Sequence, residues 1–202
     1  VFSPRKPRRM AWLVLALGLL LTGVATLRIK ADVEKNEAGE FAARTEEMKQ
    51  AIAARFDDHS RFLQSAAAFF NASDEVTREK WRIFIESQDM QKQLPGIQGV
   101  GFAQLIPAAE LAEHIQKVRG EGFPEYTVKP AGERVLYSSI VYLEPFSGRN
   151  LRAFGYDMLT EPIRQADLKH ARDTGRPMLT GKVTLVQETG KEVQPGTLLF
   201  MP

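Results

Sequence analysis

The chain has 202 residues, of which 44% are hydrophobic and 26% charged, a composition that excludes a fully disordered or collagen-like protein. It contains no cysteine, which excludes a disulfide scaffold, a cysteine-ligated metal and a cysteine nucleophile. The net charge is +2, but residues 1–30 carry six basic residues and no acidic one, so the remainder is net negative. A nucleic-acid-binding protein needs its basic surface on the folded part, and this charge distribution therefore argues against one.

Residues 10–29 are predicted to form a transmembrane helix. The 18 residues from Met10 to Leu27 carry no charge. Extended to Ile29, a helix of this length spans about 30 Å, the thickness of the hydrocarbon layer. Basic residues precede the span closely, so the positive-inside rule predicts that residues 1–9 are a cytoplasmic tail and that everything after residue 30 lies outside the cytoplasm. A cleaved signal peptide is the alternative, but its apolar core is usually shorter.

Residues 30–70 are predicted to form a long stalk helix. They are rich in good helix formers, and no proline occurs between Pro7 and Pro95. Large apolar residues recur at helical spacing in the order Phe41, Met48, Ile52 and Phe56. We expect this helix to dock on a globular core at its far end. A homodimer through the stalk helix is the expected partner arrangement, although the stripe is not a clean heptad repeat.

Residues 71–202 are predicted to form an α+β domain. Thr77 is the expected N-cap of a helix that Leu94-Pro95-Gly96 ends, with Val76 and Trp81 as the hydrophobic staple. The other expected elements are a strand over 97–106, a helix from 107 to about 120, strands over 126–129 and 135–143, a helix from 162 to Gly175, a strand over 178–188, a hairpin loop over 189–196 and a strand over 197–201.

The sequence offers no recognisable catalytic constellation. It has no G-x-S-x-G, P-loop or H-E-x-x-H motif, and its three histidines are far apart. Glu110 and His114 are four residues apart and could share a metal, but such a pair is more often a solvated helix face. We therefore predict no catalytic residue, no metal ligand and no cofactor.

Aromatic and polar residues alternate at the expected strand ends between Tyr137 and Gln187. This pattern suits a small-ligand pocket, which combines apolar walls with a few polar groups. The same aromatic side chains could instead fill the core, with Asp157 capping a turn.

Three segments carry a resemblance to a known family: LPGIQGVGFAQLIP (94–107), YLEPFSGRNLRAFGYDM (142–158) and ARDTGRPMLTGKVTLVQE (171–188). They resemble the CHASE domain, an extracytoplasmic sensor module, from about Phe56 to Pro202. The resemblance implies a long N-terminal helix that carries PAS-like lobes. It also implies a receptor whose cytoplasmic output domain is a histidine kinase, an adenylate cyclase, a diguanylate cyclase or a phosphodiesterase. The loop after Glu144 lacks the acidic residue of the plant cytokinin receptors, which argues against an adenine-type ligand. The chain stops within an apolar run, and we expect it to be a fragment without its output domain.

The predicted function is ligand sensing outside the cytoplasm, with a small molecule or peptide as ligand. The resemblance implies that Asp157, Met158, Leu179 and Thr180 lie in or beside the central strands of the ligand-holding lobe. The aromatic pattern adds Tyr142 and Tyr156, and Phe102 in the strand over 97–106 is a further candidate. The candidate ligand-binding residues are Phe102, Tyr142, Tyr156, Asp157, Met158, Leu179 and Thr180. Two other classes stay open: a membrane-anchored enzyme with an unrecognised site, and a passive coiled-coil stalk with a structural head.

Overall fold

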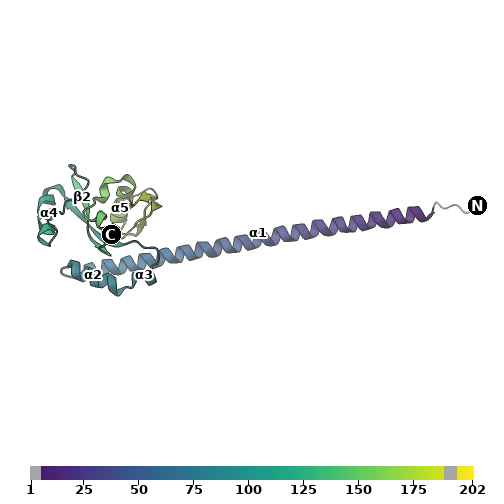
Figure 1. The fold of residues 1–202 in the computed structure, drawn as a ribbon, viewed down its shortest axis with the longest axis horizontal. Helices are drawn as coiled ribbons and strands as arrows, with labels where there is room; N and C mark the ends of the chain where they lie inside the picture. Colours follow the sequence, from purple (N-terminus) through teal and green to yellow (C-terminus); the bar gives the residue numbers. More distant parts are fainter. Residues whose placement is uncertain (1–5, 189–194) are drawn as a thin grey trace, which may run out of the picture. The chain divides into compact units, whose positions relative to one another are not determined.

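The computed structural model describes residues 6–188 and 195–202 (Figure 1). Most of the expected hairpin loop over 189–196 lies outside the described residues. The chain divides into two compact units, Val1–Arg55 and Phe56–Pro202. The second unit mixes helices with small antiparallel sheets, which confirms the α+β class. The PAS-like arrangement within that class stays a prediction.

Helix α1 runs without interruption from Lys6 to Asn71, so the apolar segment and the stalk form one helix. Its 18-residue apolar window has a mean hydropathy of 2.2 and none of it is buried inside the protein. The Thr22 and Thr26 hydroxyls in this segment donate to the backbone carbonyls four residues earlier. The helix is therefore long and apolar enough to cross a membrane, and the hydroxyls of its apolar segment are hydrogen-bonded within the helix.

Helix α2 (Arg78–Ser87) packs beside the C-terminal end of α1 (Figure 1). The Thr77 side chain accepts a hydrogen bond from the Lys80 backbone N–H, which confirms the predicted N-cap. Trp81 and Ile85 are buried against the aromatic side chains at the end of α1, and the Phe69 and Phe84 rings stack at 4.7 Å.

The expectation of one helix up to residue 94 was wrong. Helix α2 ends at Ser87 with Gln88 as its C-cap, and a short helix α3 (Met90–Gln93) follows. Asp89 between them has φ = 45°, a left-handed conformation that an α-helix cannot include and that Asp tolerates better than most residues.

Strand β1 (Val100–Pro107) pairs antiparallel with β2 (Leu136–Glu144), with an irregularity between Phe102 and Ala103. Gly101 is needed here, because a Cβ at this position would lie 2.7 Å from the Tyr142 carbonyl oxygen. Both strands agree with the sequence prediction to within a few residues.

The strand predicted over 126–129 was wrong. The structure shows only single bridges in this region, from Lys129 to Tyr156 and from Ser139 to Asp157. Tyr126 and Val128 are buried in the core between β2 and α4, so their apolar character reflects burial rather than strand pairing.

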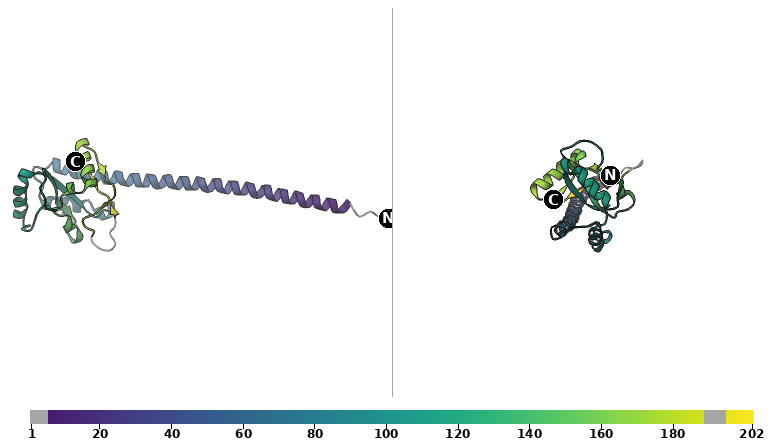
Figure 2. Two further views of the ribbon diagram at one scale, coloured as in Figure 1. Left: turned by 90° about the horizontal axis from the view of Figure 1, so that it is seen from above. Right: turned by 90° about the vertical axis from the view of Figure 1, so that its left-hand side faces the viewer.

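Two helices flank β2. A 3-10 turn (Ala108–Glu110) leads into α4 (Leu111–Gly120), and α5 spans Pro162–Thr174. Figure 1 shows α4 at one end of the second unit, with α5 separate from it and beside the short strands near the C-terminus, and Figure 2 gives two further views. Glu161 caps α5 by accepting from two backbone N–H groups, and Gly175 ends it at φ = 65°, as Pro162 and Gly175 had predicted. Two further 3-10 helices cover Gly148–Ala153 and Met158–Thr160.

The single strand predicted over 178–188 was wrong. The segment contains two short strands, β3 (Met178–Leu179) and β4 (Val183–Thr184). Strand β3 pairs with β6 (Leu199–Phe200), which is shorter than the strand predicted over 197–201, and β4 pairs with β5 (Pro195–Gly196). Both ladders face the same opposing segment, 195–200, but the register slips by one residue between them, so the pairing breaks around Gly181. No alternation of apolar residues announces this break.

Candidate functional site

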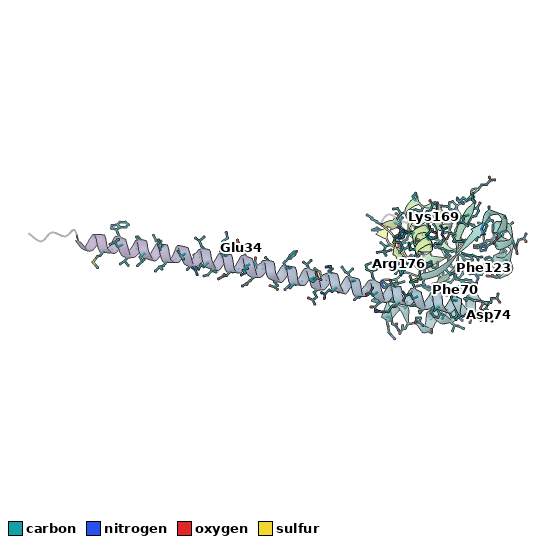
Figure 3. The ribbon with its side chains drawn as sticks, turned by 180° about the vertical axis from the view of Figure 1, so that it is seen from behind. Glu34, Phe70, Asp74, Phe123, Lys169 and Arg176 are labelled. Carbon is teal, nitrogen blue, oxygen red and sulfur yellow. The ribbon has the colours of Figure 1, made fainter. Side chains whose placement is uncertain are left out.

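Two of the predicted ligand-binding residues, Phe102 and Tyr142, lie together where β1 and β2 meet the end of α1. Their ring centroids are 6.0 Å apart, and Phe70 of α1 stacks on Phe102 at 4.3 Å. Figure 3 labels Phe70 at this point of α1. The Tyr142 hydroxyl donates to the Val76 carbonyl at 2.8 Å. These two residues thus belong to an aromatic cluster that holds α1, α2 and the sheet together.

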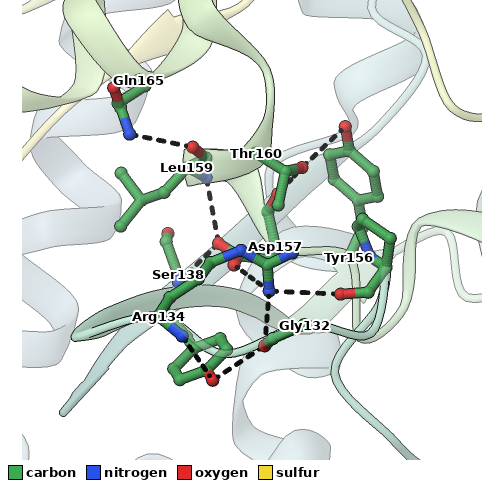
Figure 4. Close-up of polar contacts among 10 residues, drawn as sticks. Gly132, Arg134, Ser138, Tyr156, Asp157, Leu159, Thr160 and Gln165 are labelled. Atoms are coloured by element: carbon green, nitrogen blue, oxygen red, sulfur yellow. Dashed lines mark hydrogen bonds and ion pairs between the residues drawn. The ribbon is translucent and has the colours of Figure 1, made fainter. Parts of the chain in front are cut away.

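Three more, Tyr156, Asp157 and Met158, follow one another beside β2. Asp157 is fully buried, and its Oδ1 accepts from the backbone N–H groups of Ser138 at 2.9 Å and Leu159 at 3.0 Å (Figure 4). The Arg134 guanidinium lies 3.4 Å from Oδ2. The carboxylate is therefore held by the fold itself, and ligand binding by this group stays a prediction.

The last two, Leu179 and Thr180, lie at β3. Leu179 is 38% exposed, whereas Thr180 is buried and its hydroxyl accepts from the Leu198 backbone N–H at 2.9 Å. Within residues 6–188 and 195–202, no hydrogen bond, ion pair or ring contact joins these two residues to either of the other groups. The structure thus places the seven predicted residues in three separate places.

A cleft of about 310 Å³ opens between α2 and the C-terminal end of β2, and we call it the α2–β2 cleft. Of the seven predicted residues, only Tyr142 lines it. The cleft is lined by Arg78, Glu79, Trp81 and Arg82 of α2 and by Tyr142, Leu143, Glu144 and Phe146 of β2 and the loop after it. Sequence reasoning missed this site because its two halves are more than fifty residues apart and neither half carries a motif.

Arg78 forms one wall of the cleft and ties three elements together. Its Nε donates to Glu121 Oε2 at 2.9 Å, and its Nη1 donates to the Val141 carbonyl. Its guanidinium lies 4.4 Å from the Phe123 ring centroid and 5.1 Å from that of Tyr142. Both the ion pair and these cation–π contacts fix Arg78 in place.

Arg82 faces the cleft one helical turn further along α2. It makes ion pairs with Glu79 at 2.6 Å and with Glu86 at 2.8 Å, all on the same helix. Each cation that lines the cleft therefore has a carboxylate partner from the chain.

Glu144 ends β2, and its carboxyl group differs from those of Glu79, Glu86 and Glu121, which form ion pairs with the two arginines. Its Oε2 accepts from the Phe146 backbone N–H at 3.0 Å, and the described residues give its Oε1 no hydrogen-bond or ion-pair partner. Burial raises the pKa of this carboxyl group above its usual value, and the nearby charge of Glu86 adds to that shift. The hydrogen bond from Phe146 and the positive charge of Arg82 oppose it.

A second cavity of about 300 Å³ has Phe123, Tyr126 and Phe154 in its lining. Beside it, Tyr126 joins His114 Nε2 at 2.9 Å to Ser139 Oγ at 2.6 Å, forming a buried hydrogen-bonded chain. Burial lowers the pKa of His114 and raises that of Tyr126, and it therefore favours the neutral form of both groups. These three side chains serve the core.

Among the residues that the structure describes, no three His, Asp or Glu side chains are placed to hold a metal ion. The α2–β2 cleft combines aromatic walls with charged groups that are mostly paired. This arrangement suits a small ligand that packs against the aromatic rings and interacts with the charged side chains.

The family model described as the CHASE domain matches residues 74–202. No curated protein matches the chain. The matched range contains every residue of the α2–β2 cleft.

Proposed function

Because the chain belongs to the CHASE domain family, whose members are sensory modules of receptors, we propose that it is the extracytoplasmic ligand-sensing segment of a membrane signal-transduction receptor. The family match over residues 74–202 is the observation that carries this proposal. The apolar part of α1 supports it, because a helix of this length and hydropathy suits a membrane anchor for the sensor.

The proposed orientation follows from the basic residues ahead of the apolar segment, which favour a cytoplasmic N-terminus. Residues 1–9 then form a cytoplasmic tail, 10–29 the membrane span, 30–70 the stalk and 71–202 the sensor. The ligand is a small molecule or peptide, and the output domain is a cytoplasmic kinase or a cyclic-nucleotide enzyme that this chain does not include.

Packing at the end of α1 gives a physical route from ligand to membrane. Phe62, Phe69 and Phe70 of α1 pack in one core with Trp81 and Ile85 of α2. A ligand that binds one arrangement of α2 and β2 more tightly than another shifts the population of the two. Because α1 shares the core with α2, that shift changes how α1 is held, with a coupling free energy of about 1–3 kcal/mol as is usual for such systems.

We further expect the receptor to be a homodimer through the stalk helix. Phe41, Met48 and Ile52 are each more than half exposed on α1, and they lie on one side of the helix. Pairing two copies along this stripe removes these side chains from water and lets the two helices transmit a movement together.

Ligand-induced stabilisation tests the sensing role. The 202-residue chain is placed in lipid nanodiscs, and its thermal unfolding is followed with and without fractionated pools of small metabolites and short peptides. A ligand that binds only the native state raises Tm by mass action, by the equivalent of about 2.7 kcal/mol at a concentration one hundred times Kd. A fraction that is instead chemically converted by the chain, with conversion abolished by one carboxylate substitution, would contradict a purely sensory role.

A further inference from the structure

The charges around the α2–β2 cleft disfavour an anionic ligand. The cations Arg78 and Arg82 already contact three carboxylates, those of Glu121, Glu79 and Glu86. Glu144 adds a fourth acidic group, and no ion pair involves it among the described residues. The charged residues that line the cleft sum to zero when Glu144 is ionised, and the sum becomes negative once Glu86 and Glu121, the other carboxylates that the two arginines contact, are included. This balance favours a positively charged group over an anion.

The Glu144 carboxyl group is held in position before any ligand arrives. The Asn150 side chain, 3% exposed, donates to the carbonyls of Gln98 at 3.1 Å and Pro145 at 3.0 Å. These bonds fix the loop after β2, and the Phe146 N–H of the same loop holds Glu144 Oε2. Oε1 is left free to accept from a ligand. An ammonium group beside it would lower the pKa that burial has raised and keep the carboxylate ionised.

Aromatic side chains form the rest of the wall and are also fixed. Trp81 is 2% exposed, and Tyr142 is anchored through its hydroxyl to Val76. Phe146 packs edge-on against Phe123 and Phe154, with centroids 5.7 Å and 5.3 Å away. Aromatic faces attract cations, and this cluster already accommodates the guanidinium of Arg78.

We propose that the α2–β2 cleft binds a small organic cation, a primary amine or a quaternary ammonium group, between the Glu144 carboxylate and the rings of Tyr142 and Phe146, with the nearly buried Trp81 in the cleft lining. The volume of about 310 Å³ restricts the ligand to a small molecule. This inference rests on the proposed sensing function and names the chemical class of its ligand.

Trp81 supplies the reporter for the test. The chain has two tryptophans, Trp12 and Trp81, so Trp12→Phe leaves Trp81 as the single tryptophan, which is excited selectively over tyrosine at long wavelength. The Trp12→Phe chain in nanodiscs is titrated at low ionic strength with choline and butylammonium. Matched neutral probes are dimethylbutanol and butanol, and butyrate is the anionic probe. We expect a saturable change in Trp81 fluorescence with at least one cation, and an affinity about tenfold or more above that of its neutral counterpart, a difference of about 1.4 kcal/mol.

Two variants separate the role of Glu144 from unspecific charge. Glu144→Gln keeps an acceptor for the Phe146 N–H but cannot ionise, and it should remove the preference for the cation over its neutral counterpart. Glu113→Gln removes one exposed acidic residue of α4 that does not line the cleft, and it should leave the preference unchanged. Thermal melts of both variants without probe establish that they are folded.

The proposal is overturned if neutral probes or butyrate bind as tightly as the cations, if folded Glu144→Gln retains the cation preference, or if no cation gives a saturable response at millimolar concentration. If the cations fail while a metabolite or peptide fraction still raises Tm, the sensing function stands and only the ligand class assigned to this cleft is wrong. If neither raises Tm nor changes Trp81, the sensing function itself is contradicted.

Discussion

The carboxylate of Asp157 accepts a hydrogen bond from the backbone N–H of Ser138 at 2.9 Å, which fastens the segment before α5 to strand β2. Asp157 also binds Leu159 N–H and lies 3.4 Å from Arg134 (Figure 4). Because the group is fully buried, water cannot replace these partners when they are lost.

Asp157→Asn should therefore lower the free energy of unfolding by about 1.5–3 kcal/mol, the usual worth of hydrogen bonds to a charged group. Asp157→Ala should cost about 3–5 kcal/mol, because it leaves Arg134 and two N–H groups without their partner. Urea titration of the Trp12→Phe chain, followed by Trp81 fluorescence, measures both.

Asp173→Asn is the control for this experiment, since the Asp173–Arg172 pair is exposed and worth at most about 1 kcal/mol. Unchanged stability with a weakened ligand response would instead support the predicted role of Asp157 in the pocket.

Gly155 should not tolerate a side chain. It has φ = 81°, and an added Cβ would collide with the Thr127 carbonyl oxygen across the bridge between Lys129 and Tyr156. Gly155→Ala should destabilise the fold by more than about 1 kcal/mol, because both the backbone strain and the collision act in the same direction. Gly120→Ala, at the end of α4 with nothing within 4 Å, is the matched control and should be neutral or stabilising. Equal effects of the two substitutions in denaturant melts would refute this reading.

His114 should make the protein less stable in acid. Burial lowers its pKa below the ordinary value of 6.5, so the unfolded chain binds more protons than the folded one just below that pH. The free energy of unfolding should consequently fall as the pH drops through 6.5 and level off once the pH is below the folded-state pKa. His114→Gln, which retains a hydrogen-bonding group for Tyr126, should flatten this dependence. Urea melts across the pH range test it, and an unchanged slope in the variant would show that other groups are responsible.

The stalk should cross-link through its apolar stripe. The chain has no cysteine, so Ile52→Cys introduces a single thiol on the exposed stripe of α1. In a parallel dimer this position faces its counterpart, and mild oxidation should give a disulfide-linked dimer. Gln50→Cys points to another side of the helix and should cross-link much less. Equal yields for the two positions on gels without reductant would contradict pairing along this stripe.

The helices were largely predictable because their signals are local. The absence of proline and the abundance of helix formers predicted α1, the Thr77 hydroxyl predicted the start of α2, and Pro162 with Gly175 predicted α5. Each of these signals acts through backbone groups within one turn, so no knowledge of tertiary packing was needed.

The remaining differences are tertiary in origin. The left-handed turn at Asp89 and the isolated bridge at Lys129 depend on what packs around them, which periodicity does not contain. The α2–β2 cleft is harder still, since it exists only because β2 brings Glu144 beside α2. Tyr142 was predicted from its place at a strand end, whereas Arg78, Trp81 and Glu144 carry no sequence signal of a shared site.

The side of the membrane on which the folded part lies is the most direct test of a membrane-anchored sensor. Single cysteines are introduced by Ser3→Cys, ahead of the apolar segment, and by Ser87→Cys, exposed at the end of α2. Intact cells expressing each variant are treated with a membrane-impermeant maleimide, and lysed cells provide the control for reactivity. The account predicts labelling at Ser87→Cys but not at Ser3→Cys in intact cells, with both labelled after lysis. Labelling at Ser3→Cys but not at Ser87→Cys would contradict it.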